Sequence, residues 1–386
     1  VVMKTVWISL GLVGLVCGSP VDEFTAAAKA KHGEVGAKAA EFLVAHMPER
    51  DKAGLTAEFL TENLDLAFQA RATFPWAGQV PEKLFWNDVL PYAVLDETRE
   101  PCRKGFLEIA TDLVRDAKTA SEAAQTLNRE FFNRIEVHYD TGRKRPNQSP
   151  AESIESGKAT CTGLSIILVN ACRAVGIPAR AVGTPLWSNK RGNHTWVEIW
   201  DGEWRFTGAD EYDPAGLNRG WFTADAARAK ADDPAHAIYA SSWKQTGLSF
   251  PLAWALGNHE VAAVNVTANY AGETTDEPSV GVRLWDRKGG QRITAEVRLL
   301  DANGNLIGEG ETRSGTADLN DMVSFRIGPV FTGLLCFTVG DESRKLPIQQ
   351  PAVGESTLDV AWKDLAKTSP GLAVVEAWML QPAAKR

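Results

Sequence analysis

The sequence predicts an α+β fold with a helical N-terminal lobe, a mixed α and β core and a C-terminal β-sandwich. Up to about residue 134, apolar residues recur at three- and four-residue spacing, the period of an amphipathic helix. After about residue 250 the period changes to two, and strand-like runs alternate with turns. Between these regions, a buried helix is followed by an alternating hairpin. A chain of 386 residues is long enough for two or three such domains.

Residues 1–18 have the features of a signal peptide. Lys4 supplies a positive start, residues 6–16 are mostly apolar, and small residues before Ser19 offer a cleavage site. We therefore expect an exported protein, periplasmic or extracellular, that keeps four of its five cysteines after cleavage.

The helical lobe is expected over residues 19–134. Two sets of apolar residues repeat with helical spacing, one around Leu60 and Leu64 and one around Phe106 and Leu113. An aromatic connector at residues 85–92 separates the two sets and contains Pro91, which disfavours continuation of a helix.

The core is expected over residues 135–250 and contains the informative cysteine. Residues 160–163, Thr-Cys-Thr-Gly, begin an apolar helix that Gly176 and Pro178 terminate. Cys161 therefore lies in the first helical turn, where the helix dipole and unbonded N–H groups favour a thiolate. The same N–H groups can stabilise an oxyanion on an attacked carbonyl. Cys172 lies on the apolar face of the helix and is interpreted as a small hydrophobic residue.

A hairpin after this helix supplies a base and carboxylates. His194 begins a strand that turns at residues 201–202, and a second strand runs back over residues 203–207. Asp210 and Glu211 follow directly. A thiol, an imidazole and a carboxylate in this order form a layout for nucleophilic catalysis, in which the third group orients the base. The other histidines (His32, His46, His138, His236 and His259) have no comparable context.

The β-sandwich is expected over residues 251–345, followed by a short tail over residues 346–386. Its alternating runs are typical of an immunoglobulin-like or transthyretin-like domain. No nucleophile and base are paired in this region.

Composition excludes several functions. The net charge is −8, whereas a nucleic-acid-binding protein usually has a basic surface. No apolar stretch reaches the ~20 residues that are needed to span a bilayer. Cys102, Cys161, Cys172 and Cys336 show neither CxxC spacing nor a disulfide framework. No metal and no cofactor are therefore expected, and the sequence does not indicate an oligomeric state.

Residues 161–180 and the run Asn-His-Thr-Trp-Val-Glu-Ile-Trp-Asp-Gly-Glu-Trp at 193–204 resemble the transglutaminase-like superfamily, in particular its secreted bacterial, papain-like cysteine hydrolases. The resemblance implies a papain-like core with Cys161 as nucleophile and His194 as base. It also implies a protein or peptide substrate and an acyl-thioester intermediate.

The third catalytic residue is ambiguous. The superfamily commonly has an Asp four residues after the strand Trp, but Gly208 stands there in this sequence. Asp210 is preferred because strand alternation places it on the side of Trp204, and Glu211 is the rival.

The expected reaction is hydrolysis of peptide or carboxamide bonds. Trp187, in the loop before His194, is expected to contact substrate. Lys190 and Arg191 in the same loop would repel an incoming lysine ammonium, which favours water as the second nucleophile. A protein-glutamine transamidase and an inert binding or scaffold protein on the same fold are the alternatives.

Overall fold

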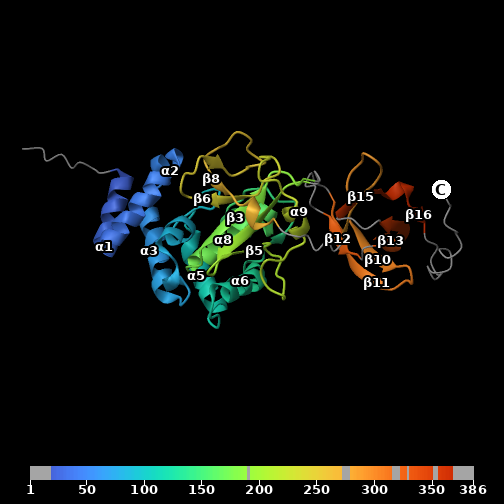
Figure 1. Ribbon diagram of the computed structural model, residues 1–386, viewed down its shortest axis with the longest axis horizontal. Coiled ribbons are helices and arrows are strands. Elements are labelled where there is room, and N and C mark those ends of the chain that lie inside the picture. Colours follow the sequence, from blue (N-terminus) through green and yellow to red (C-terminus); the bar gives the residue numbers. More distant parts are fainter. Residues whose placement is uncertain are drawn as a thin grey trace, which may run out of the picture.

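The structure is a computed structural model that describes residues 19–188, 192–271, 279–314, 322–327, 330–350 and 355–367. Within these residues, N-terminal helices, a mixed core and C-terminal strands follow one another along the long axis (Figure 1), and the predicted α+β class is confirmed. The expected signal peptide, as well as Lys190 and Arg191, lie outside the described residues. No helix in the described ranges is long and apolar enough to cross a bilayer.

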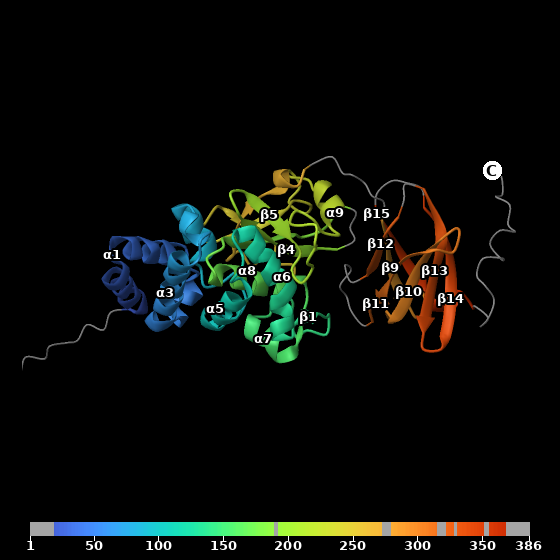
Figure 2. The same cartoon turned by 90° about the horizontal axis from the view of Figure 1, so that it is seen from below.

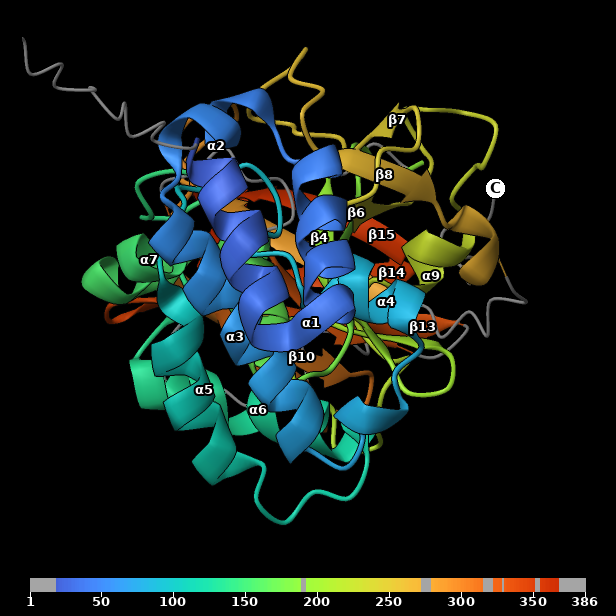
Figure 3. The same cartoon turned by 90° about the vertical axis from the view of Figure 1, so that its left-hand side faces the viewer.

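The N-terminal helices form a hydrophobic core of their own. Ser19 and Asp22 make a capping box that starts the first helix, and Gly33, at φ 66°, interrupts it. Seen end-on, these helices cover one end of the molecule (Figure 3). Their apolar side chains pack around Leu60 and around Phe85 of the aromatic connector. The elements are α1 (Pro20–His46), α2 (Glu49–Gly54), α3 (Ala57–Thr73), α4 (Glu82–Leu84) and the π-helical η2 (Phe85–Val89).

The next two helices share the core of the mixed domain. They are α5 (Cys102–Leu113) and α6 (Ala120–Ile135). The rings of Phe106 and Phe131 lie 4.9 Å apart, and both belong to the same hydrophobic cluster as Leu164 of α8 (Cys161–Ala174). From the sequence we expected these two helices in the N-terminal lobe, because the helical period of apolar residues does not reveal what a helix packs against.

A six-stranded sheet supports α8. Its order is β5-β4-β3-β6-β8-β7, and every pairing is antiparallel. The expected boundary at residue 250 cuts this sheet, because Val264 of β8 pairs with Ala240 of β6. The strands are β3 (Ala179–Thr184), β4 (His194–Trp200), β5 (Trp204–Thr207), β6 (Tyr239–Ser242), β7 (Leu248–Ser249) and β8 (Ala262–Asn265).

The C-terminal strands form two sheets around one hydrophobic cluster, which includes Val282 and Leu335. Both sheets lie beyond the core in the view from below (Figure 2). The expected tail after residue 345 contributes strands to both sheets, so the sandwich continues to Lys367. One sheet has β10 (Ala295–Asp301), β11 (Leu306–Thr312), β13 (Phe331–Val339), β14 (Glu342–Gln350) and β16 (Ala366–Lys367); the other has β9 (Ser279–Trp285), β12 (Val323–Arg326) and β15 (Glu355–Ala361).

Candidate active site

Cys161 is the first residue of α8 and so lies in the first helical turn, where the sequence predicts it. Thr160 before it is extended, with φ −105°. Just upstream, β2 (Lys158–Ala159) pairs in parallel with β1 (His138–Tyr139). The remaining residues of α8 are buried, whereas Cys161 is partly exposed. The thiol therefore lies at the accessible N-terminal end of α8, where the backbone N–H groups of the first turn have no partner within the helix.

The cysteine helix and the histidine strand are joined directly. The hydroxyl oxygens of Thr162 and Thr195 lie 3.2 Å apart, and Ser165 Oγ donates to the Thr195 carbonyl at 3.2 Å. Thr195 follows His194, and Thr162 follows Cys161. These two buried contacts therefore fix the nucleophile helix against the start of the strand that carries the imidazole.

Aromatic rings surround His194, which is 3% exposed. Its ring centroid lies 4.7 Å from that of Trp221, 4.8 Å from Phe222 and 5.6 Å from Trp196. Trp187 stacks on Trp196 at 5.9 Å and is only 1% exposed. Trp187, which was expected to contact substrate, is thus buried among the rings around His194. Trp221 lines the cavity instead.

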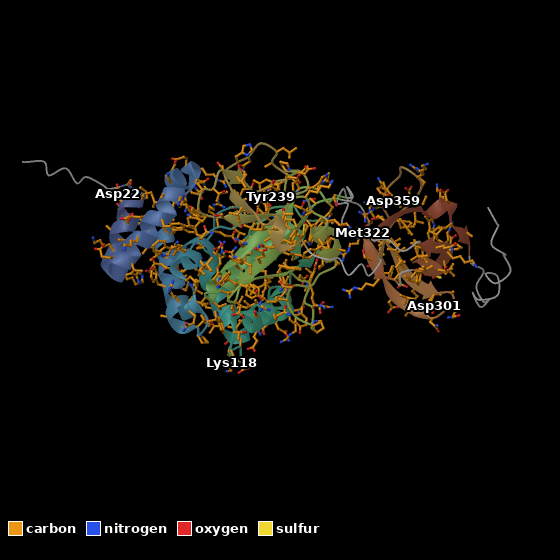
Figure 4. The ribbon with its side chains drawn as sticks, viewed as in Figure 1. Asp22, Lys118, Tyr239, Asp301, Met322 and Asp359 are labelled. Atoms are coloured by element: carbon orange, nitrogen blue, oxygen red, sulfur yellow. The ribbon has the colours of Figure 1, made fainter. Side chains whose placement is uncertain are left out.

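One cavity of about 490 Å³ brings the predicted site residues together. Cys161, His194, Asp210 and Glu211 all line it. Arg313, Met322 and Ser324 of the C-terminal sandwich complete its wall. Figure 4 shows Met322 at the junction between core and sandwich.

Asn128 of α6 holds the segment that carries the two carboxylates. Its amide nitrogen donates to Thr207 Oγ1 at 3.0 Å and to the Gly208 carbonyl at 2.8 Å. Its amide oxygen accepts from the Asp210 N–H at 2.9 Å. Asp210 has a left-handed backbone, with φ 63°. The strand has ended at Thr207, so alternation no longer decides where the side chain of Asp210 points.

The carboxylate of Asp210 faces His138 of β1, with 3.1 Å between Oδ2 and the imidazole Nδ1. Burial raises the pKa of Asp210, and its contact with His138 acts in the opposite direction. The sequence offered no signal for His138, because the residue lies 72 positions from Asp210 along the chain.

Glu211 points elsewhere. Its Oε1 accepts from Trp221 Nε1 at 3.0 Å, and its Oε2 is buried without a hydrogen-bond partner in the described part of the chain. A Cβ added to Gly208 would overlap this carboxylate and lie 2.6 Å from its Cδ. The Glu211 carboxylate therefore occupies the space that a side chain at position 208 would enter. Burial raises its pKa to about 7.

The other described cysteines are poor nucleophiles. Burial raises the pKa of the thiols of Cys102 and Cys172 to about 12 and also raises that of Cys336. A thiol with so high a pKa has almost no thiolate at neutral pH. No group of three or more His, Cys, Asp or Glu side chains in the described ranges is placed to hold a metal ion.

Residues 107–226 match the family model of the transglutaminase-like superfamily, so the chain contains a transglutaminase-like domain. The match begins within α5, contains α6, α8 and the hairpin strands β4 and β5, and includes Cys161, His194, Asp210 and Glu211.

Two solved structures are also similar to this chain. One is a candidate cysteine protease from Cytophaga hutchinsonii, with 18% identity over 42% of this chain and a TM-score of 0.25. The other is red sea bream transglutaminase, with 11% identity over 75% of this chain and a TM-score of 0.25. In each case the aligned region spans 58% of the other protein. No curated protein matches the sequence.

Proposed function

We propose that this protein is an exported cysteine hydrolase of the transglutaminase-like type that cleaves peptide or carboxamide bonds through a thioester on Cys161. The observation that carries the proposal is the shared cavity of Cys161, His194 and the two carboxylates after β5. A helix-terminal thiol, a buried imidazole and a nearby carboxylate are the groups that such chemistry requires.

The reaction consists of two acyl transfers. Cys161 Sγ loses its proton to His194 and attacks the substrate carbonyl, and His194 returns the proton to the departing amine. Water then attacks the thioester carbonyl while His194 accepts a proton from it. The C–S bond breaks, a carboxylic acid leaves, and the proton returns to Cys161. The N–H groups of the first turn of α8 are the candidate donors to the oxyanion in both steps.

Glu211 is the better candidate for orienting His194. Asp210, which strand alternation favoured, is hydrogen-bonded to His138. Glu211 has a buried carboxylate oxygen, lines the cavity and bonds Trp221, whose ring is 4.7 Å from that of His194. Its carboxylate also lies over Gly208, where the superfamily pattern has its acid. These contacts support Glu211, with Asp210 positioning β1 through His138.

The test is to capture the acyl-enzyme. A pool of synthetic peptides would be mixed with the full-length protein. The peptides contain internal Gln and Asn and differ in the residues on either side of their peptide bonds. Acid quenching would be followed by intact-mass and peptide-mapping analysis. A mass addition on Cys161, absent in Cys161→Ala, supports the proposal. Turnover that survives in Cys161→Ala would contradict it. Adding excess primary amine decides the second step, since a dominant amine adduct would indicate a transamidase.

A further inference from the structure

A second imidazole–carboxylate pair lies in the candidate active-site cavity. His138 of β1 and Asp210 line this cavity together with Cys161 and His194. Nδ1 of His138 lies 3.1 Å from Asp210 Oδ2 and 3.3 Å from Oδ1. The cavity therefore holds two imidazoles, whereas the thioester mechanism gives a role to only one of them.

Asp210 is held in place by two elements. Its N–H donates to the side-chain oxygen of Asn128 in α6 at 2.9 Å, and its carboxylate contacts the backbone of Tyr139 in β1. Its backbone is left-handed, with φ 63°, a conformation that Asp adopts more readily than most other residues. Together these contacts keep the carboxylate at Nδ1 of His138.

The carboxylate determines which ring nitrogen of His138 carries the hydrogen. An ionised carboxylate only accepts hydrogen bonds, so Nδ1 is the donor and the neutral ring has its acceptor lone pair at Nε2. No residue in the described part of the chain hydrogen-bonds to Nε2, and the side chain is 54% exposed. His138 thus offers a fixed hydrogen-bond acceptor to a molecule in the cavity.

β1 connects this acceptor to the nucleophile. The strand pairs in parallel with β2, where Tyr139 lies opposite Ala159. The N–H of Asp140 donates to the Ala159 carbonyl at 2.9 Å, and Cys161 follows two residues later as the first residue of α8. The position of His138 relative to an acyl group on Cys161 is therefore set by backbone hydrogen bonds.

The second half-reaction needs such an acceptor. Water that attacks the thioester passes one hydrogen to His194, and a water held by that hydrogen alone is poorly aligned with the carbonyl. The two carboxylates in the cavity are engaged, because Asp210 accepts from His138 and Glu211 accepts from Trp221. Nε2 of His138 can accept from the other hydrogen of the water.

We infer that His138 positions the water that hydrolyses the thioester on Cys161. The water oxygen bonds to the thioester carbonyl carbon and one proton passes to His194, while the second hydrogen stays on the oxygen and is hydrogen-bonded to Nε2 of His138. The C–S bond breaks, His194 returns its proton to the thiolate, and the carboxylic acid leaves. The inference rests on the proposed function and adds the residue that orients its second nucleophile.

Acetylation by 4-nitrophenyl acetate separates the two half-reactions without a known substrate. The burst of 4-nitrophenolate from the full-length protein measures acetylation, and peptide mapping after removal of the ester follows the loss of the acetyl group from Cys161. We expect this loss to be at least about tenfold faster than hydrolysis of S-acetyl-N-acetylcysteine at the same pH. His138→Asn should change the burst rate less than about twofold and slow the loss of the acetyl group about tenfold or more.

Two substitutions at His138 distinguish positioning of water from support of β1. The amide of Asn takes the place of Nδ1 and keeps a donor for Asp210, whereas the longer Gln places its amide oxygen near Nε2 and keeps an acceptor. Positioning of water predicts slower deacetylation in His138→Asn than in His138→Gln, and support of β1 predicts the reverse. His32→Asn is the matched control, because His32 pairs with Asp65 at 2.6 Å outside the cavity, and it should change neither step.

Failure of the proposed function gives a different result. If 4-nitrophenyl acetate acetylates Cys161 no faster than N-acetylcysteine, the nucleophile assignment fails and the inference fails with it. If Cys161 is acetylated rapidly but loses the acetyl group no faster than the free thioester, or equally fast in His138→Asn, only the inference fails. An equal fall of both steps in His138→Asn, or slower deacetylation in His138→Gln than in His138→Asn, would show that His138 only supports β1 and would also overturn the inference.

Discussion

The carboxylate of Glu211 lies over Gly208, in the space that a Cβ at position 208 would enter. The resemblance to the superfamily implies an acidic residue at position 208. In this chain the carboxylate of Glu211, three residues later, lies at that position. The left-handed turn at Asp210 makes this possible by reversing the chain between the two positions. The absence of an Asp at 208 is therefore no argument for an inert protein.

The first prediction compares the two candidate carboxylates. Glu211→Gln should lower turnover at least about a hundredfold, since a neutral amide orients and stabilises an imidazolium poorly. Asp210→Asn should have a smaller effect, because the Asp210 carboxylate contacts His138 and the Tyr139 backbone of β1. The measurement is kcat/KM on any substrate shown to acylate Cys161, with circular dichroism to verify the fold.

Moving the acid provides the control. Glu211→Ala clears the space over Gly208, and adding Gly208→Asp to it should recover part of the lost activity. A larger loss from Asp210→Asn than from Glu211→Gln would return the role to Asp210.

The second prediction concerns pH and stability. The pKa of Glu211 is about 7 in the folded protein, against an ordinary value of 4.5. The folded state therefore binds more protons between these values, and stability falls as pH rises from about 4.5 to 7. Relative to Glu211→Gln, the native protein should lose about 2 to 3 kcal/mol between pH 5 and pH 8. Urea unfolding at both pH values measures this, and exposed Glu108→Gln is the control. A pH-independent difference between native protein and Glu211→Gln would contradict the burial argument.

The third prediction concerns the network behind the histidine strand. Trp196 Nε1 donates to the Tyr270 hydroxyl at 2.9 Å, and this hydroxyl donates to Glu198 at 2.7 Å. Tyr270→Phe would leave both buried groups without this partner and should cost about 1–3 kcal/mol of unfolding free energy. Tyr239→Phe is a matched control, since its hydroxyl makes only a 3.4 Å bond to the Pro234 carbonyl. Equal effects of the two changes would show that the network does not stabilise the core.

The fourth prediction concerns where the core ends. A chain of residues 19–271 keeps β8 and Tyr270 and should fold and react with iodoacetamide at Cys161. A chain of residues 19–250 loses the strand that pairs with β6 and β7, and it should be unstable to thermal unfolding. Equal melting temperatures for the two chains would show that β8 is dispensable. Loss of labelling in a folded 19–271 chain would show that the sandwich is needed for the thiol to react.

Local patterns predicted the elements that carry the site. Helical period and end signals located α8 with Cys161 in its first turn, and alternation with a Gly turn located β4 and β5. These features depend on neighbouring residues, so a single sequence reveals them.

Contacts between distant segments could not be predicted in this way. Alternation favoured Asp210 over Glu211 as the partner of His194, but alternation holds only within a strand and β5 ends at Thr207, so which carboxylate orients His194 stays a prediction. The pairing of β8 with β6, the helix packing of α5, and the place of Arg313 in the cavity each depend on the tertiary fold. Nothing in the residues around them indicates these partners.

The central claim is that Cys161 is a nucleophile activated by His194, and alkylation tests it most directly. The full-length protein would be treated with iodoacetamide between pH 5 and pH 9, and the rate at each cysteine followed by peptide mapping. We predict that Cys161 reacts at pH 6 at least about tenfold faster than Cys102, Cys172 and Cys336, because a helix terminus and an imidazole that lines the same cavity favour the thiolate. His194→Ala should move the pH profile of Cys161 upward. A Cys161 that reacts no faster than the other three at pH 6, with a half-point at or above the ordinary thiol value of about 8.5, would contradict the account.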